Sequence, residues 1–152
     1  MDVLEIAERY KLIIWDFDGT IVNLYVDWKG LKRELLSIGD LYIKIKKDLF
    51  LNELIYLGEQ DISKDAIFKI IEKYELKADF SVNEISVRLI EKIHNFEVIQ
   101  YILSDNMDKT IKTILNKLQI LKFFELIISK ECVKRFKPNP EGMIKDIETL
   151  QY

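Results

Sequence analysis

The chain has 152 residues, of which 23 are basic and 26 acidic, so its formal net charge is −3. With 49% hydrophobic and 32% charged residues the composition is globular, which excludes general disorder, and it lacks the basic excess typical of nucleic-acid-binding proteins. Its apolar runs are too short for a transmembrane helix, and its acidic N-terminus lacks the order of a signal peptide. We therefore expect a cytoplasmic protein with no nucleic-acid and no membrane partner. The single cysteine, Cys132, excludes an internal disulfide and, together with a single histidine, argues against a zinc site.

The first half of the chain predicts one buried strand followed by helices. Residues 2–9 have the pattern of a short amphipathic helix. The run Leu-Ile-Ile-Trp at 12–15 is apolar on both faces, which predicts a strand buried in a parallel sheet, and the Asp-Gly that follows marks its exit into a loop. Residues 27–77 carry apolar side chains at helical spacing and predict three helices, the last of them capped by Ser63.

A helix and a second strand are predicted next. Ser81 and Glu84 have the spacing of a capping box, which predicts a helix running to about Asn95. Residues 98–103 form a second apolar run, interrupted only by Gln100. This run again predicts a strand that is buried on both faces.

The last third of the chain repeats the alternation. A helix is predicted after the polar segment 104–106, and residues 126–128 predict a third short strand. Asn139 followed by Pro140 predicts the start of a last helix, because proline is well tolerated at the first helical position.

Strands that alternate with helices and are this apolar predict an α/β fold with a Rossmann-like parallel sheet. The helical stretch between the first two strands is too long for a simple crossover. We therefore predict an α/β core made of residues 1–24 and 80–152, with residues 25–79 inserted as a small helical cap above the carboxyl ends of the strands.

Two carboxylates follow the first strand. Asp16 and Asp18 are two residues apart, and side chains at this spacing in an extended chain point the same way. Both would then face the crevice at the carboxyl end of the sheet, where open α/β folds bind ligands. The pair could hold a divalent cation through oxygen ligands, or one carboxylate could attack phosphorus while the other moves protons. Gly19 permits a sharp turn, and Thr20 adds a hydroxyl.

Three motifs in order resemble those of the haloacid dehalogenase-like (HAD) hydrolase superfamily, in its phosphatase branch. Asp16-Phe17-Asp18-Gly19-Thr20 resembles the first motif, and Ser104 at the end of an apolar strand resembles the second. Lys137-Pro138-Asn139-Pro140-Glu141 resembles the third, a lysine followed by Pro-x-Pro at a helix start. The resemblance covers nearly the whole chain and includes a helical cap between the first two motifs.

The resemblance implies a role for each matching residue. Asp16 would be the nucleophile that forms an aspartyl-phosphate, and Asp18 the general acid and base. Ser104 would hydrogen-bond a phosphoryl oxygen, and Lys137 would stabilise negative charge on the nucleophile and the phosphoryl group. A Mg²⁺ ion would bridge Asp16, the backbone carbonyl of Asp18 and the phosphate.

Four further residues are candidates for binding the substrate. Gly19 and Thr20 continue the first motif, and Asp105 and Asn106 follow Ser104 at the start of a predicted helix. Backbone N–H groups at such a helix start favour an anion.

The sequence departs from the family at its fourth motif, one or two aspartates that follow a further strand. Residues 142–152 have helical spacing instead, so we interpret Asp146 and Glu148 as solvated helix charges. The Mg²⁺ site would then have one acidic ligand fewer. In the family's sheet order the strand 12–15 would become an edge, which we expect a second copy of the chain, the N-terminal segment or a partner to cover. A homodimer covering this edge and a truncated gene are both compatible with the sequence.

Several residues have alternative interpretations. Asp105 could replace the missing metal ligand, but we favour Asp105 or Asn106 as an ordinary N-cap. Lys134 is the alternative to Lys137 as the catalytic lysine. We interpret His94 as a surface residue and Cys132 as inert. Two aromatic residues after the first motif are either packing residues or the lining of the cap entrance: Tyr25 and Trp28.

The sequence thus predicts a Mg²⁺-dependent phosphatase that acts on a small phosphorylated metabolite, with a phosphoglycolate-phosphatase-like activity as the nearest analogy. A phosphomutase would use the same two aspartates. The alternative is a catalytically weak or inactive homologue with a binding or assembly role. The intact set Asp16, Asp18, Ser104 and Lys137 argues against long decay.

Overall fold

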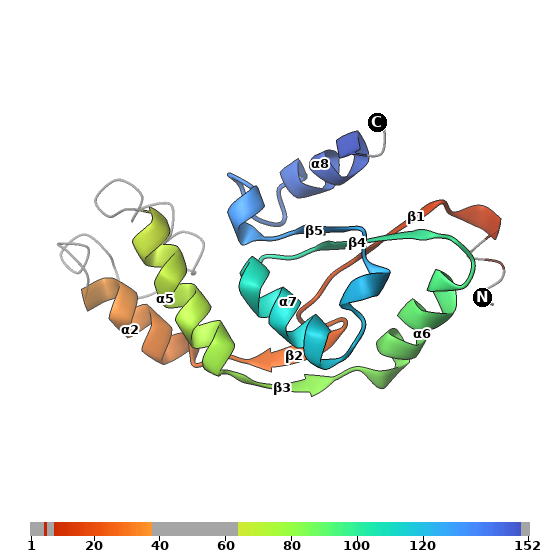
Figure 1. Ribbon diagram of the computed structural model, residues 1–152. Coiled ribbons are helices and arrows are strands. Elements are labelled where there is room, and N and C mark those ends of the chain that lie inside the picture. Colours follow the sequence, from red (N-terminus) through yellow and green to blue (C-terminus); the bar gives the residue numbers. More distant parts are fainter. Residues whose placement is uncertain (1–4, 6–7, 38–63, 150–152) are drawn as a thin grey trace. The chain divides into compact units, whose positions relative to one another are not determined.

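The computed structural model describes residue 5, residues 8–37 and residues 64–149, apart from the side chains of 145–147 and 149 (Figure 1). The chain divides into two compact units. Residues 1–24 and 80–152 form the larger unit, and residues 25–79 form the smaller unit.

The strands and helices alternate along the chain, and the three predicted strands are all present. The α/β fold with a parallel sheet is therefore confirmed. Two short strands that the sequence analysis did not predict flank the smaller unit. In chain order the elements are β1 (Leu12–Trp15), β2 (Val22–Tyr25), α2 (Trp28–Ser37), α5 (Lys64–Lys77), β3 (Asp79–Val82), α6 (Glu84–His94), β4 (Ile99–Leu103), α7 (Asp108–Lys117), the 3₁₀ helix η1 (Leu121–Phe123), β5 (Leu126–Ile128), the 3₁₀ helix η2 (Lys130–Cys132) and α8 (Glu141–Thr149).

Some predictions fall on residues that the structure does not describe. The middle one of the three helices predicted within residues 27–77, and the Ser63 cap of the last one, lie in the segment 38–63, outside the described residues. Of the helix predicted over residues 2–9, the described residues Glu5, Glu8 and Arg9 are helical.

The three predicted strands, which lie far apart in the sequence, form one parallel sheet in the order β1-β4-β5. In its register Trp15 of β1 pairs with Ile102 of β4, and Leu103 pairs with Ile128 of β5. The three strands therefore end side by side, and the polar residues that follow them meet at one edge of the sheet. Among the described residues β1 pairs with β4 alone, so β1 is the edge strand of this sheet. That a partner covers it stays a prediction.

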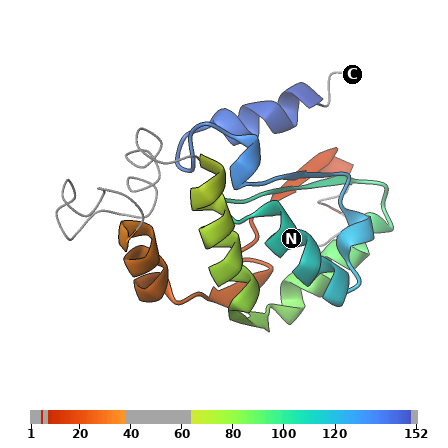
Figure 2. The ribbon, with the colours of Figure 1, turned by 60° about the vertical axis from the view of Figure 1, so that its left-hand side comes forward.

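Helices cover both faces of this sheet. Figures 1 and 2 show α8 on one side of β4 and β5, and α6 and α7 on the other. Helix α8 lies close to the end of β4, because a Cβ added at Gly142 would meet the side chain of Leu103. Apolar side chains of α6 and α7, among them Ile90, Ile111 and Leu115, are fully buried in the core of this unit. No helix within the described part of the chain is both long enough and apolar enough to span a membrane.

Gln100 is the one polar interruption of β4, and the structure explains it. Its side chain is 1% exposed. Its Oε1 accepts a hydrogen bond of 2.9 Å from the indole Nε1 of Trp15, and its Nε2 donates one of 3.1 Å to the carbonyl oxygen of Ile90. A buried amide is tolerated when both its ends are paired, and here it links β1, β4 and α6.

We expect Gln100→Leu to destabilise the protein by about 2 kcal/mol, because the indole N–H of Trp15 would stay buried without an acceptor. Urea unfolding followed by tryptophan fluorescence measures the loss. Trp15→Phe removes the donor as well, so in the double variant the loss should be smaller than the sum of the two single losses. Additive losses would contradict the pairing.

The helix that follows β3 starts two residues later than the capping box predicts. Ser81 lies within β3, where its Oγ accepts a hydrogen bond from Asn23 at 3.4 Å. The N-cap of α6 is Asn83, whose side chain accepts hydrogen bonds from the backbone N–H groups of Ile85 and Ser86. The capping-box prediction was wrong because strand pairing between β2 and β3 extends the chain through Ser81.

The smaller unit, within its described residues, contains α2 and α5. Gly30 lies where α2 approaches α5, since a Cβ at this position would meet the Asp27 carboxylate and the ring of Tyr74. One turn further along α2, Glu34 binds Lys73 of α5 through both carboxylate oxygens, at 2.6 and 2.7 Å. The hydrogen bond from Lys73 lowers the pKa of Glu34, and the Glu34 carboxylate raises the pKa of both Lys73 and Tyr74.

We expect Glu34→Gln to lower the melting temperature at neutral pH by no more than about 3 °C, because exposed ion pairs contribute little. The pKa of Glu34 is depressed, so the contribution of this carboxylate is present above its ordinary pKa of 4.5 and is lost as the pH falls through the lower folded-state value. The pKa of Lys73 is raised, so its contribution persists until the pH rises above 10.5. Thermal melts at several pH values should therefore show the two proteins converging in acid, and a difference that survives there would contradict the assignment.

Candidate active site

Asp16 and Lys137 form an ion pair although 121 residues separate them in sequence. The Nζ of Lys137 donates to Oδ1 of Asp16 at 2.7 Å. Asp16 is the first residue after β1, and Lys137 lies in the loop between η2 and α8. Their side chains are 47% and 37% exposed, so the pair is open to a ligand from solvent. The structure thus places the predicted nucleophile beside the predicted catalytic lysine.

The segment after Asp16 is a tight turn held by several backbone hydrogen bonds. The carbonyl oxygen of Phe17 accepts from the N–H groups of Ile21 and Val22 at 2.9 and 3.1 Å, and Gly19 N donates to the carbonyl of Val22 at 2.7 Å. Gly19 has φ +85°, a left-handed conformation that favours glycine. The turn brings the side chain of Asp18 next to β2, where its Oδ1 accepts a hydrogen bond from the backbone N–H of Leu24 at 2.9 Å.

Gly19→Ala should destabilise the protein by about 1–2 kcal/mol through backbone strain alone, because nothing lies within 4 Å of an added Cβ. Asn tolerates this conformation better, so Gly19→Asn should cost less. Urea denaturation of the two variants tests the order. Equal stability of the alanine variant and the wild type would contradict the strained conformation.

Thr20 contributes its backbone rather than its hydroxyl to the contacts of the turn. Its carbonyl oxygen accepts from the Ser86 hydroxyl of α6 at 2.8 Å. The neighbouring carbonyl of Ile21 accepts from Asn83 N at 2.9 Å. These bonds tie the first motif to the start of α6.

Ser104 is the first residue after β4 and is 2% exposed. Its hydroxyl donates to Oδ1 of Asn106 at 2.8 Å, and the N–H of Asn106 donates back to the hydroxyl oxygen at 3.1 Å. The one proton of the hydroxyl is therefore given to Asn106, and a phosphoryl oxygen would have to replace that acceptor.

The start of α7 differs from the prediction. Its N-cap position is occupied by Met107, which has no side-chain oxygen, so neither Asp105 nor Asn106 caps the helix. The N–H of Asp108 instead donates to Oε2 of Glu131 at 2.9 Å, and this oxygen also accepts from the Ser129 hydroxyl at 2.7 Å. The N-cap prediction was wrong because a carboxylate from a distant segment takes the place of a local cap.

Asp105 contacts the loop 133–140 between η2 and α8, which carries Lys137 and is called the lysine loop below. Its Oδ1 accepts a hydrogen bond of 3.3 Å from the backbone N–H of Lys137. Glu141 holds the same loop at its base, since its two carboxylate oxygens accept from the N–H groups of Lys134 and Arg135 at 2.9 and 3.1 Å. Sequence reasoning missed Glu141, and its place one residue after the Pro-x-Pro was the available signal.

Helix α8 starts one residue later than the prediction, at Glu141. Asn139 Oδ1 accepts from Glu141 N at 3.0 Å, and Ile144 N donates to the carbonyl of Pro140 at 2.9 Å. The side chain of Asn139 thus caps the first N–H group of α8, whereas Pro140 precedes the first helical residue.

The oxygen donors at the carboxyl end of β1 suit a hard cation. Mg²⁺ is usually held by one or two carboxylates together with other oxygens, water and substrate phosphate, and the Asp16 carboxylate and the backbone carbonyl of Asp18 offer such oxygens. Over the described ranges no group of three or more His, Cys, Asp or Glu side chains is arranged to hold a metal ion. The residues therefore fit a Mg²⁺ ion that depends on substrate and water for the rest of its shell.

The alternative candidates lie elsewhere or act differently. Lys134 is exposed and contributes its backbone N–H to Glu141. His94 is exposed at the end of α6, near the amino ends of the strands, and its ring lies 4.7 Å from that of Phe123. Cys132 is exposed, and its Sγ lies 3.5 Å from the hydroxyl oxygen of Ser129. Two aromatic side chains of the smaller unit are well exposed: Tyr25 at 62% and Trp28 at 41%.

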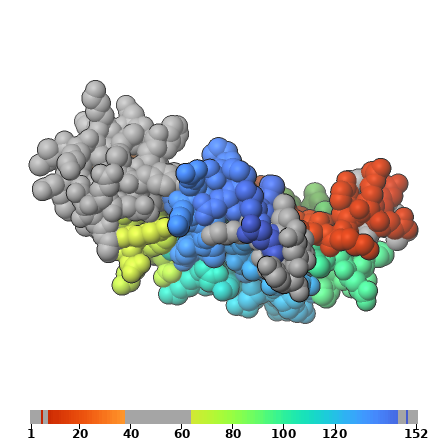
Figure 3. Space-filling view, turned by 90° about the horizontal axis from the view of Figure 1, so that it is seen from above, coloured from red at the N-terminus to blue at the C-terminus, as the bar shows by residue number. Residues whose placement is uncertain are grey.

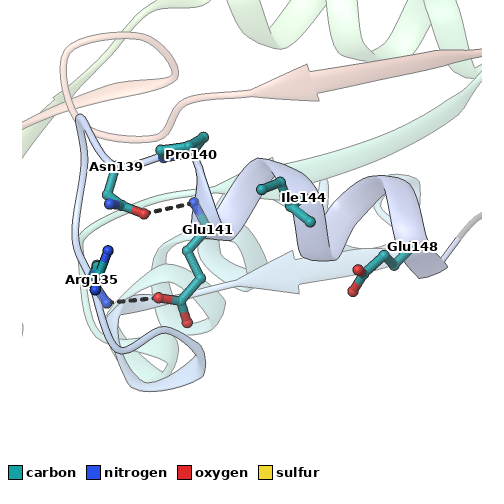
Figure 4. Close-up of a pocket in the computed structure, with 6 residues that line it drawn as sticks. All are labelled: Arg135, Asn139, Pro140, Glu141, Ile144 and Glu148. Atoms are coloured by element: carbon teal, nitrogen blue, oxygen red, sulfur yellow. Dashed lines mark hydrogen bonds between the residues drawn. The ribbon is translucent and has the colours of Figure 1, made fainter.

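A separate pocket of about 420 Å³ lies along α8 (Figure 4). It contains none of the four predicted catalytic residues. Figure 3 views the molecule from above and shows the C-terminal segment that includes α8 on the facing surface of the larger unit. The pocket is lined by Arg135, Asn139, Pro140, Glu141, Ile144 and Glu148.

A family model for haloacid dehalogenase-like hydrolases matches residues 13–152 of the chain. The match includes all three motifs and the ion pair that joins two of them. The chain belongs to the haloacid dehalogenase-like hydrolase family, so the resemblance is confirmed and the enzyme class is that of the hydrolases. A search of curated proteins finds no match.

Solved structures of this superfamily share the fold. CbbY from Rhodobacter sphaeroides, in complex with phosphate, is 12% identical with a TM-score of 0.61, and the match covers 94% of this chain and 73% of that one. A predicted phosphoglycolate phosphatase from Haemophilus somnus is 16% identical with a TM-score of 0.58 and coverages of 93% and 72%. The HAD-hydrolase YfnB from Bacillus subtilis, bound to magnesium, is 17% identical with a TM-score of 0.52 and coverages of 93% and 72%. At these identities the likeness shows the fold alone.

Proposed function

We propose that the protein is a Mg²⁺-dependent phosphatase that hydrolyses a small phosphorylated metabolite through an aspartyl-phosphate on Asp16. The observation that carries this proposal is the 2.7 Å ion pair between Lys137 and Asp16 at the carboxyl end of the sheet. The ammonium of Lys137 lies against the carboxylate that would attack phosphorus, so the same ammonium can neutralise charge on an incoming phosphate. Three structural relatives further support the proposal: CbbY was solved in complex with phosphate, YfnB was solved with bound magnesium, and the Haemophilus somnus protein is a predicted phosphoglycolate phosphatase.

The first chemical step forms a bond between a carboxylate oxygen of Asp16 and phosphorus. The bond from phosphorus to the substrate oxygen breaks, and Asp18 gives that oxygen its proton. In the second step Asp18 takes a proton from water, the hydroxide oxygen bonds to phosphorus and the bond to Asp16 breaks. Free phosphate leaves and both aspartates return to their starting forms.

The remaining residues hold charge during these steps. Lys137 neutralises the phosphoryl oxygens and the carboxylate, and Ser104 donates one hydrogen bond once it leaves Asn106. A bound Mg²⁺, held by Asp16, Asp18 and substrate oxygens, would supply further neutralisation of the phosphoryl charge. Residues 25–79, the smaller unit, would serve as the cap that selects the substrate.

A second candidate is a catalytically weak homologue that binds a phosphorylated ligand without efficient turnover. The observation that favours it is that the described residues gather no third acidic ligand for the metal. A phosphomutase would use the same aspartates and differ only in the acceptor of the phosphoryl group. The homodimer and the cytoplasmic location stay predictions.

We expect Asp16→Asn to lower the hydrolysis of p-nitrophenyl phosphate by about 10³-fold or more, because the nucleophile is lost. Lys137→Ala should lower it by about 10²–10³-fold, as for other charge-stabilising groups. Both are measured as kcat with saturating Mg²⁺ and again with EDTA, which should abolish the wild-type rate.

Glu125→Gln is the matched control, because this exposed carboxylate lies just before β5, at the opposite end of the strands. Its rate should equal that of the wild type. Activity that persists in Asp16→Asn would contradict the proposed mechanism. If the wild type turns over nothing and calorimetry still detects Mg²⁺-dependent phosphate binding, the second candidate is favoured.

A further inference from the structure

The backbone of Lys137 is held by a carboxylate that the proposed mechanism does not use. Asp105 follows Ser104 at the tip of β4, and its Oδ1 accepts from Lys137 N at 3.3 Å. The side chain of Lys137 meanwhile reaches Asp16 at the tip of β1. Because β1 and β4 pair in register up to Trp15 and Ile102, Asp105 and Asp16 are fixed to the same edge of one sheet.

We propose that Asp105 is a positioning residue, which anchors the backbone N–H of Lys137 so that the lysine ammonium reaches Asp16. The effect on turnover rests on the proposed function; the effect on the ion pair does not. Glu141 fixes the first part of the same loop, because its carboxylate accepts from the N–H groups of Lys134 and Arg135. Asp105 then fixes the position of the Lys137 backbone relative to the sheet.

A flexible lysine needs such an anchor. Its side chain has four rotatable bonds, and its ammonium is a point charge without the rigid fork of an arginine. The loop between η2 and α8 is irregular, so β-ladder bonds do not place Lys137. A hydrogen bond to a carboxylate is stronger than one to a neutral acceptor, which makes a fixed aspartate an effective anchor for an N–H group.

The other roles that the sequence allows for Asp105 are less compatible with the structure. The residue does not cap α7, whose N-cap is Met107. A third metal ligand beside Asp16 and Asp18 would form a cluster of three acidic side chains, and no such cluster occurs among the residues that the structure describes. The contact with the loop is the one that its geometry shows.

The decisive experiment observes Lys137 directly, without any substrate. Lysine labelled with ¹³C and ¹⁵N gives side-chain signals for each ammonium, and Lys137→Arg assigns the signal of Lys137. In Asp16→Asn that signal should move to the position and line width of a mobile, unpaired lysine. Asp105→Ala should move it at least halfway in the same direction, whereas Asp105→Asn, which keeps an Oδ1 acceptor, should leave it close to the wild-type position.

Asp108→Asn is the matched control. This carboxylate is three residues away, and its side chain forms an i,i+4 pair with Lys112 at 2.8 Å. Removing its charge should not move the Lys137 signal. If Asp105→Ala does not fold, Asp105→Glu serves instead, because the extra methylene displaces the carboxylate and should shift the signal partway.

Steady-state kinetics of the same variants connect positioning to turnover. With p-nitrophenyl phosphate we expect Asp105→Ala to lower kcat by about 10–100-fold with a less than about twofold change in KM, since a misplaced group costs rate rather than binding. Asp105→Asn should recover most of the rate. The Mg²⁺ concentration for half-maximal activity should stay unchanged in both.

Each outcome separates the two proposals. A Lys137 signal that ignores Asp105→Ala overturns the positioning role, even if Asp16-dependent hydrolysis is found. A signal that moves as expected in a protein without phosphatase activity supports positioning and refutes the proposed function. A large rise in the Mg²⁺ requirement of Asp105→Asn would overturn positioning in favour of a metal-ligand role.

Discussion

The ion pair between Asp16 and Lys137 is the contact on which the proposed chemistry depends. It joins the first residue after β1 to a loop that follows the last strand of the sheet. Parallel strands make this contact feasible, because their carboxyl ends lie at one edge whatever the sequence separation. The register of β1, β4 and β5 therefore determines which side chains can meet there.

Hydrogen bonds to the backbone help to place two charged groups of this site, Asp18 and Lys137. Asp18 accepts from Leu24 N, and Lys137 donates its own N–H to Asp105. Glu141 and Glu131 accept from the N–H groups of the lysine loop and of α7. Acidic side chains thus satisfy backbone donors that irregular segments would otherwise leave unpaired, and the same bonds limit the motion of the catalytic groups.

The sequence predicted the elements whose signals are strong and local. The apolar runs of β1, β4 and β5, the stripe of α7 and the Asn139 cap before α8 were all found. Long-range partners were not predictable. Ser81 satisfies the capping-box pattern but is recruited into β3, and the cap of α7 comes from Glu131, 23 residues away. Asp105 could be identified as a site residue, but its partner Lys137 N is set by tertiary packing alone.

The closed pair of hydrogen bonds between Ser104 and Asn106 has a consequence for ligand selection. An anion entering this site must displace an internal acceptor that is tethered two residues away and is therefore always present at high effective concentration. Monodentate, weakly basic anions such as chloride gain too little to do so. Under the proposed function, a tetrahedral dianion would replace the amide oxygen while it also binds the ammonium of Lys137, so the amide of Asn106 would compete with ligands and select them by valency and charge.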